Sequence, residues 1–409
     1  MTTKNNIPAG YKDSAVGIIP QEWEVKRLGS IAKCFSGGTP KSESEEMYGG
    51  TIPFIRSGEI HGDKTALYLT DDGLRKSSAK MVNVGDLIFA LYGANSGDCA
   101  ISQINGAINQ AILCIRSLSV INPFLQPYLE LQKDRFIAKY LQGGQGNLSG
   151  EIVSSYTIPV PPLAEQRKIA EILGVWDEAI EKQSRLIEKL ELRKRALMQR
   201  LLTGRTRLSG FTTPWQKVKL GAISEEFVLR NTDDNNYIVL SCTKYNGLVS
   251  SLDYFGKQIF SDNLRSYKVV PKYHFAYATN HIEEGSIGYQ GSYDYALISP
   301  MYTVFKTDDT KVDNYFLYTL LKTPLMIYNY QSRIEGSIDR RGGLKWDAFA
   351  GIIIKLPSLP EQKAIAEVLT TADDEIATNR KKLDALRLQK RGLMQQLLTG
   401  KTRVKFKIL

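Results

Sequence analysis

The sequence predicts a mixed α/β protein with two domains in tandem, each followed by a long helix. The two helices are expected to pair as an antiparallel coiled coil with pseudo-two-fold symmetry. Three observations lead to this prediction. The chain has 409 residues, enough for two or three domains of ordinary size. It contains an internal repeat, and the repeated segment has the apolar spacing of a coiled coil.

The repeat joins two segments near the middle and the end of the chain. Residues 165–207 align without a gap on residues 361–403, with 21 of 43 positions identical. A weaker echo lies upstream, where Trp23 and Leu28 recur as Trp215 and Leu220. The chain therefore divides into a first domain at residues 1–160, a helical spacer at 161–209, a second domain at 210–357, and a second spacer with a C-terminal tail at 358–409.

The two variable regions share a layout of short apolar runs bounded by Gly, Asn and Asp, which is typical of strands. The expected strands are residues 51–56, 86–92 and 111–116, then 237–242, 275–278 and 296–305. A helix is expected after each set, at residues 122–141 and 313–330. Mixed α/β domains follow from this order of elements.

Each repeated segment reads as one long helix with a narrow apolar seam. Pro161 and Pro162 halt the preceding segment, and Gly204 and Gly400 follow the last periodic leucines as C-terminal caps. We expect Glu165, in the first turn, to complement the helix dipole. The expected seam consists of Ile169, Leu173, Trp176, Ile180, Ile187, Leu190, Leu197 and Leu201, then Ile365, Leu369, Ile376, Leu383, Leu386, Leu393 and Leu397.

Polar residues interrupt both seams at equivalent places, Gln183 and Lys194 in the first. Such interruptions fix register and orientation. We favour pairing of the two helices within one chain, although a parallel homodimer satisfies the same heptads. Packing of each helix on a separate domain is a weaker alternative, because that arrangement usually needs a wider apolar stripe.

The formal charge of +10 is concentrated in the repeats. Residues 161–209 carry +4 and residues 358–409 carry +5, whereas the variable regions carry 0 and +1. Helix-dipole effects explain only the last turn of each helix. We expect the other cations to contact either DNA phosphates or an acidic protein partner; the candidates are Arg193, Lys194, Arg195, Arg205, Arg207, Lys390, Arg391, Lys401 and Arg403.

Composition argues against several classes of protein. Four cysteines without a CxxC pair, and three histidines not spaced around them, disfavour a zinc site, so no metal is expected. No apolar run approaches the length of a membrane span. A cytoplasmic location is expected.

Motifs for catalysis are weak throughout. The glycine-rich segment at residues 36–40 lacks the spacing of a phosphate-binding loop, so we expect a turn. Glu361 and Lys363 resemble a nuclease ExK element, but the other repeat has the same helix start with no strand-borne Asp before it. No methyltransferase motif or nucleophile elbow is present. The sequence therefore favours a recognition and assembly protein without catalytic residues.

The duplicated segments at residues 161–173 and 358–369, each opening a helix that ends in LMQxLLTG[RK]TR, resemble the conserved regions of type I restriction-modification specificity subunits. The WxxxxLG starts are similar to the entry of that family's target-recognition domains. The resemblance implies that each domain reads one half of a bipartite DNA site and that the helices set the gap between the halves. It also implies a non-catalytic subunit that binds two methyltransferase subunits, with two restriction and translocase subunits in the full complex. S-adenosylmethionine, ATP and Mg are then expected on the partner subunits and not on this chain.

An adaptor that binds only proteins through its coiled coil remains the alternative. Under the favoured interpretation, polar residues in loops should contact bases, since Arg pairs well with guanine and Asn or Gln with adenine. The candidates are Thr39, Lys41, Arg56, Asn95, Gln145 and Asn147 in the first domain, and Asn280, Arg333, Arg340, Arg341 and Lys345 in the second.

Overall fold

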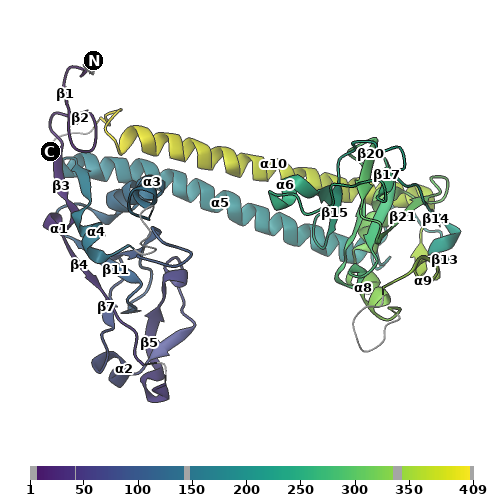
Figure 1. The fold of residues 1–409 in the computed structure, drawn as a ribbon, viewed down its shortest axis with the longest axis horizontal. Helices are drawn as coiled ribbons and strands as arrows, with labels where there is room; N and C mark the ends of the chain where they lie inside the picture. Colours follow the sequence, from purple (N-terminus) through teal and green to yellow (C-terminus); the bar gives the residue numbers. More distant parts are fainter. Residues whose placement is uncertain (1–6, 42, 142–147, 335–342, 406–409) are drawn as a thin grey trace. The chain divides into compact units, whose positions relative to one another are not determined.

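A computed structural model describes residues 7–41, 43–141, 148–334 and 343–405. The chain forms two compact units, Met1–Ser184 with Lys381–Leu409, and Arg185–Arg380. Each unit contains one variable region and parts of both long helices (Figure 1). No helix in the described ranges is long and apolar enough to cross a membrane.

The two long helices are the predicted ones. Helix α5 is Leu163–Leu201 and helix α10 is Leu359–Leu397. Both have 39 residues, and their bounds differ by the repeat offset of 196. Gly204 and Gly400 follow them with φ of 69° and 73°, the left-handed conformation of a helix C-cap.

The domain in the first unit contains two four-stranded sheets. One has the strand order β4-β11-β8-β9, with β4 Ala32–Ser36, β11 Ile112–Ser117, β8 Leu87–Ala90 and β9 Cys99–Ile101, all antiparallel. The other has the order β6-β5-β10-β7, with β6 Leu67–Leu69, β5 Tyr48–Ile55, β10 Gly106–Ile108 and β7 Lys80–Val82. Strand β10 runs parallel to β5 and antiparallel to β7.

Shorter pairs and helices complete this domain. The pairs are β1 Tyr11–Lys12 with β2 Ile19–Pro20, and β3 Glu24–Arg27 with β12 Thr157–Val160. The helices are α1 Leu28–Ile31, α2 Asp71–Arg75, α3 Asn122–Leu141 and α4 Gly150–Ser155. Within this unit, α3 and α4 lie toward the long helices, whereas β5, β7 and α2 lie away from them (Figure 1).

The domain in the second unit repeats this framework. Its four-stranded sheet has the equivalent order β14-β21-β18-β19, with β14 Ser224–Glu226, β21 Tyr302–Thr307, β18 Phe275–Ala278 and β19 Ile287–Tyr289. The pairs are β13 Gln216–Lys219 with β22 Ile353–Leu356, β15 Leu240–Thr243 with β16 Gly247–Ser250, and β17 Lys268–Pro271 with β20 Tyr295–Ile298. The helices are α6 Ser251–Phe255, α7 Asn314–Leu321, α8 Pro324–Gln331 and α9 Trp346–Ala350.

Two predicted elements of the second domain were wrong in extent. The helix expected at 313–330 is two helices, because Pro324 starts α8 and the Thr323 side chain caps it by accepting from the Met326 backbone N–H. The strand expected at 296–305 is divided between β20 and β21, with a turn at Ser299–Met301 that contains Pro300. In both places a proline interrupts the predicted element, whereas the apolar pattern of the sequence continues across the proline.

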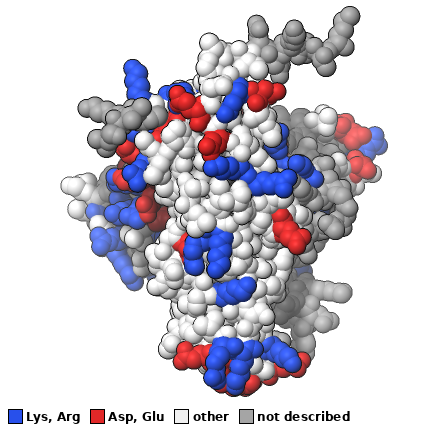
Figure 2. Space-filling model, turned by 90° about the vertical axis from the view of Figure 1, so that its left-hand side faces the viewer, with Lys and Arg blue, Asp and Glu red and all other residues white. Residues whose placement is uncertain are grey.

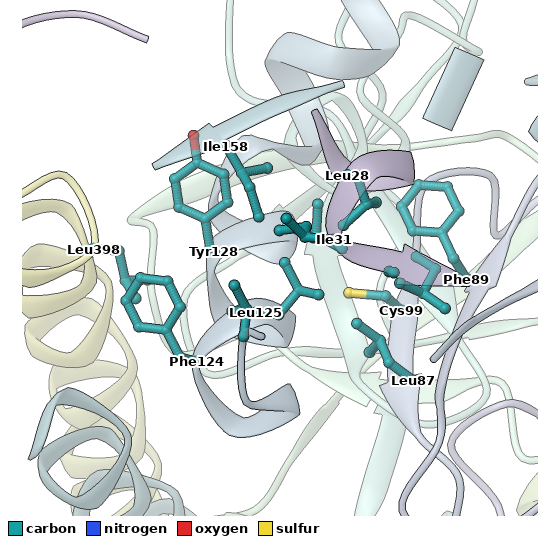
Figure 3. Packing of buried hydrophobic residues seen from close by; sticks show 14 of the residues in the cluster. Leu28, Ile31, Leu87, Phe89, Cys99, Phe124, Leu125, Tyr128, Ile158 and Leu398 are labelled. Atoms are coloured by element: carbon teal, nitrogen blue, oxygen red, sulfur yellow. The ribbon is translucent and has the colours of Figure 1, made fainter. Parts of the chain in front are cut away.

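The core of each unit joins the domain to the helix ends. In the first unit, Leu398, which follows α10, is fully buried beside Phe124 of α3, and the cluster continues through Leu125 and Ile158 to Leu28 (Figure 3). In the second unit, Leu201 and Leu202, at the end of α5, are buried with the domain core. The end of each long helix is therefore part of a domain core.

Gly400 and Gly204 allow a matched test of this packing. A Cβ on Gly400 would lie 2.4 Å from Cδ of Pro20, whereas one on Gly204 would lie 3.4 Å from Trp215. Both residues have positive φ, so both alanine variants should lose about 1 kcal/mol from backbone strain. We expect Gly400→Ala to lose roughly 1–3 kcal/mol more than Gly204→Ala, because it also overpacks a core. Urea unfolding measures both losses.

Gly174→Ala is the control, because nothing lies within 4 Å of its added Cβ in the interior of α5. That variant should gain up to about 1 kcal/mol from helix propensity. Equal losses in the two C-cap variants would contradict the packing of Gly400 against Pro20.

Candidate functional site

A buried carboxylate links the first residues of α5 to the segment after α10 in the first unit. Glu165 is fully buried, and its carboxylate accepts from Nε of Arg403 at 2.7 Å and from Nη2 at 3.1 Å. Nε1 of Trp23 donates to the same carboxylate at 2.8 Å. Arg403 also donates to Glu22 at 2.8 Å, and its hydrogen bonds to Glu165 and Glu22 raise the pKa of its guanidinium. We call Glu165 and Arg403 the first clamp.

The same arrangement recurs in the second unit at the equivalent positions. Glu361 is fully buried and accepts from Nε and Nη2 of Arg207 at 2.5 and 2.7 Å. The Trp215 ring lies 5.9 Å from the Arg207 guanidinium, but its buried Nε1 has no partner among the described residues. Glu361 and Arg207 form the second clamp. The expectation that Glu165 complements the helix dipole missed this ion pair.

The glutamine beside each clamp carboxylate ties the domain to the helix. The Gln166 side chain donates to the Pro161 carbonyl at 2.8 Å and accepts from the Ile121 N–H at 3.0 Å. Gln362 repeats both bonds, donating to Pro357 at 2.9 Å and accepting from the N–H of Asp313 at 2.9 Å. Each Glu-Gln pair therefore fixes a domain and both long helices in one place.

The long helices pair within each unit and run in opposite directions. In the first unit Lys390 pairs with Asp177, and in the second unit Lys194 pairs with Asp373. These positions are equivalent in the repeat. The lysines among the polar residues predicted to fix register are thus ion-paired to the opposite helix. Tyr315 of α7 also donates to Asp373, which joins the second domain to this pair.

All fifteen residues of the expected seam are buried or half-buried. Trp176, Ile180, Leu197, Leu386 and Leu393 are the half-buried ones. The predicted antiparallel pairing of the helices within one chain is confirmed, since each unit contains helix segments that run in opposite directions.

Six of the nine cations predicted to contact phosphates or a partner are engaged inside the chain. Four of them are the arginines of the two clamps and the lysines that pair across the seam. The other two are Arg193, which pairs with Glu375, and Arg391, which lies 3.7 Å from Asp134. Arg195, Arg205 and Lys401 make no ion pair within the described residues. On the face shown in Figure 2, Lys and Arg lie in several separate groups, and Asp and Glu lie beside some of them. Much of the charge in the repeats therefore serves helix pairing.

The structure brings two of the candidate base contacts of the first domain together. The Asn95 side chain donates to the Ser57 carbonyl at 3.2 Å, which places it beside Arg56. Nε of exposed Arg56 donates to Glu59 at 3.1 Å. Thr39 and Lys41 are exposed on a separate loop, where Thr39 hydrogen-bonds to Gln110. Gln145 and Asn147 lie outside the described residues.

Two candidates of the second domain also lie on neighbouring segments. The N–H of Leu344 donates to the Thr279 carbonyl at 3.0 Å, so exposed Lys345 and exposed Asn280 belong to adjoining strips of backbone. Arg333 is half-buried after α8 and donates to Asn329 at 3.2 Å. Arg340 and Arg341 lie outside the described residues. Contact of any of these residues with bases stays a prediction.

The glycine-rich segment at residues 36–40 packs against protein. A Cβ on Gly37 would lie 1.8 Å from the carbonyl oxygen of Ile108, and one on Gly38 would lie 2.4 Å from Cβ of Ser78. The two glycines are thus needed where the backbone passes β10 and residue 78. This close packing accounts for the two glycines, so their presence does not require a phosphate-binding role.

The cysteine thiols and one group of possible metal ligands give little support for catalysis or metal binding. Burial raises the pKa of all four thiols, those of Cys114 and Cys242 to about 12, so the thiolate form is rare at neutral pH. Among the described residues, His281, Glu283 and Glu284 have ligand atoms within 4.8 Å of one another. Two of these three residues are exposed, and surface acids often gather without a metal.

Comparison with known proteins identifies the family. The model of the type I restriction modification DNA specificity domain matches residues 20–192 and again residues 214–388. The chain belongs to this family. It is a specificity subunit of a type I restriction-modification system, with two recognition domains.

Individual relatives agree with this assignment. The chain is 25% identical over 427 residues to the type I restriction enzyme MjaVIII specificity subunit of Methanocaldococcus jannaschii, covering 95% of this chain and 94% of that protein. It is 25% identical over 177 residues to the EcoR124I/EcoR124II specificity subunit of Escherichia coli, covering 41% and 44%.

Solved structures share the fold. The S subunit from M. genitalium superposes with a TM-score of 0.54 at 16% identity, covering 97% of this chain and 98% of that one. A chain from a study of assembly and conformational transition of the type I R-M system gives a TM-score of 0.59 at 17% identity, covering 94% and 99%.

The first clamp predicts a specific loss of stability. Glu165→Gln keeps the shape of the side chain but leaves the Arg403 guanidinium with exposed Glu22 as its charged partner. We expect the free energy of unfolding to fall by about 2 kcal/mol. The loss should shrink in an Arg403→Gln background, because the two residues act together. Urea unfolding of the single and double variants measures this coupling.

Glu171→Gln is the control for the clamp. Glu171 is exposed on the same helix and makes only a surface pair with Lys168. That change should cost less than about 0.5 kcal/mol. Equal losses at positions 165 and 171 would show that the buried ion pair does not stabilise the unit.

Proposed function

We propose that this chain reads a bipartite DNA site with its two domains and holds the methyltransferase subunits that modify it. One observation carries the proposal. A common framework is built twice, with the same order in one four-stranded sheet and the same Glu–Arg clamp, while the remaining strands and loops differ between copies. Two different surfaces on one framework suit two different half-sites, as base contacts specify sequence and the scaffold positions them.

The reading surfaces proposed here are the loops that carry Arg56 and Asn95 in the first domain, and Asn280 and Lys345 in the second. In each pair the two residues come from segments that are close in space. Arg and Asn side chains can make bidentate contacts to guanine and adenine. Arg56 already shares a bond with Glu59, so it would have to release that carboxylate or use its remaining donors.

The paired helices are proposed to fix the distance between the two half-sites. A helix of 39 residues is about 58 Å long at 1.5 Å per residue. The ion pairs of Lys194 and Lys390 oppose sliding of one helix along the other, because each lysine lies in the seam beside one carboxylate. A fixed register of the two helices would give a fixed distance between the two half-sites.

The chain is proposed to lack catalytic residues of its own. S-adenosylmethionine would be bound by two methyltransferase subunits, and ATP and Mg by two restriction and translocase subunits in the full complex. The site of action would be the cytoplasm, where cellular DNA lies. The alternative of an adaptor that binds only proteins is not favoured, since the family is defined by DNA specificity.

Co-expression with the methyltransferase subunit of the same host tests the proposal. We expect adenine methylation at a new two-part DNA word, detected by genome-wide sequencing of methylated bases. The methyltransferase subunit alone should leave those sites unmodified. The purified chain alone with S-adenosylmethionine should transfer no methyl group. An unchanged methylome in the co-expressing strain would refute the proposal.

Exchange of one domain tests the division of labour. Residues 210–357 replaced by the equivalent region of another specificity subunit should change one half of the methylated word and preserve the other half and the gap. The reason is that the Glu361–Arg207 ion pair and both long helices lie outside the exchanged segment. The incoming region has to supply again the contacts that Trp215, Asp313, Tyr315 and Pro357 make with them. A change in both halves would show that the domains do not read independently.

A further inference from the structure

One loop of each domain is held in the same backbone frame. In the first domain it is residues 91–97, between β8 and β9, and in the second domain it is residues 279–285, between β18 and β19. We call them the matched loops. Strands β8 and β18 hold the same place in the sheet order that the domains share. The strands that flank the first loop are fixed in the core, where Phe89 and Cys99 lie with Leu125 of α3 (Figure 3).

Equivalent backbone hydrogen bonds close the two matched loops. The Ala90 N–H donates to the Asp98 carbonyl at 2.8 Å, and the Ala278 N–H donates to the Ser286 carbonyl at 3.0 Å. Both bonds span eight positions of the chain. The two loops therefore have the same length and the same closure.

A second equivalent contact holds the start of each matched loop. The Leu148 N–H donates to the Leu91 carbonyl at 3.0 Å, and the Leu344 N–H donates to the Thr279 carbonyl at 3.0 Å. Both donor leucines are buried. Each loop is thus attached to its domain at both ends by bonds that do not depend on the loop's own side chains.

The side chains of the matched loops differ, although the frame is shared. The first loop reads LYGANSG and the second TNHIEEG, so six of seven residues have changed. The shared residue is the last one, Gly97 or Gly285, with φ of 82° or 92°, a conformation that favours glycine. An unconstrained surface loop varies in length as well as in sequence. A fixed frame around replaced side chains is expected where a protein presents different groups at one place.

A lysine from the domain helix holds the end of each matched loop. Lys133 of α3 pairs with the carboxylate of Asp98. Lys322, the residue after α7, donates to the carbonyl oxygens of Gly285 at 2.7 Å and Lys244 at 2.6 Å. Burial lowers the pKa of the Lys322 ammonium group. The two lysines come from different positions of their helices, yet both bind the segment that closes the loop.

The matched loops present different hydrogen-bonding groups. Asn95 and Ser96 are half-buried in the first loop, and Asn280, His281 and Glu284 are exposed in the second. Asn can pair with adenine, and Glu can accept from the amino group of cytosine. Loops that offer different donors and acceptors in one frame suit the recognition of different bases.

We infer that residues 91–97 and 279–285 are equivalent reading loops of the two domains, and that Lys133 and Lys322 are positioning residues that hold them. This assignment rests on the proposed function. It adds the segment of each domain at which a change of side chains alone changes the bases that are read. Each lysine acts through the loop that it holds.

Transfer of side chains between the matched loops tests the reading role. The variant keeps buried Ile282 and takes the first loop's residues at four other positions of the second loop. Its substitutions are Asn280→Tyr, His281→Gly, Glu283→Asn and Glu284→Ser. Co-expressed with the methyltransferase subunit, it should methylate a word with an altered second half and an unaltered first half and gap. Sequencing of methylated bases gives the word.

Three single variants give the same test with smaller changes to the fold. They are Asn280→Ala, His281→Ala and Glu284→Ala, all at exposed positions. At least one of them should relax the second half of the word at one base pair. An unchanged second half in all three single variants would overturn the reading role of the loop.

Lys322→Met tests the positioning role, because it removes the ammonium group and keeps most of the aliphatic stem. Methylation of words with one altered base in the second half should rise about tenfold relative to the correct word, roughly the discrimination of one base contact. Discrimination in the first half should stay the same. Lys133→Met should have the mirror effect on the first half. A uniform fall in methylation, with both halves read as before, would overturn the positioning role.

Lys306→Met is the matched control. Lys306 lies on β21 of the same domain and pairs with Glu225 of the neighbouring strand β14. This variant should keep the word and its discrimination. Failure of the unaltered chain to direct methylation would refute the proposed function itself. An active unaltered chain whose second half is unaffected by all of the loop variants would refute the reading loops alone.

Discussion

The structure depends on two buried carboxylates, each held by an arginine from the far end of the other repeat. Glu165 and Glu361 are fully buried, and a buried carboxylate is strongly unfavourable unless it is paired and hydrogen-bonded. The arginines supply two bonds each and can do so only if the two helices are antiparallel and in one register. The clamps therefore couple the topology of the chain to the neutralisation of a buried charge. The clamps also differ, since Trp23 adds a bond to the first and Trp215 adds none to the second.

The clamps also explain how two domains can share a framework and diverge in their loops. Gln166 and Gln362 hold the start of the domain helix by its backbone N–H, which does not depend on the side chains of the domain. One four-stranded sheet has the same strand order in both copies, whereas the first domain has a second four-stranded sheet where the second domain has two-stranded pairs. A backbone attachment leaves the rest of the domain free to vary.

Much of the fold could be predicted from the sequence, because the repeat and the seam are regular. The long helices and their C-caps follow from periodicity and glycine placement. The breaks at Pro324 and Pro300 were missed, since apolar runs on both sides hid the proline signals. The clamps were missed for a different reason. Glu165 and Arg403 are 238 positions apart, so no local pattern joins them. The signal in the sequence was that both repeats begin with a glutamate and end with an arginine.

The loops that would read DNA were the least predictable part. Candidates such as Asn95 and Asn280 were chosen for their chemistry, and only the tertiary structure shows which of them are neighbours. The basic residues were also ambiguous in sequence, because a lysine that pairs across a seam and a lysine that meets a phosphate look the same in a charge count. Contacts such as Lys390 with Asp177 separate the two.

The division of the chain into units has a consequence for its synthesis. The second unit is one continuous stretch, Arg185–Arg380, so all of its residues emerge from the ribosome before the chain is finished. The first unit begins the chain but includes Met394, Leu397 and Leu398 in its core. Its first 184 residues must therefore wait, with part of their apolar surface uncovered, until the last helix is made. The domain synthesised first is therefore completed only after Met394, Leu397 and Leu398 have been made.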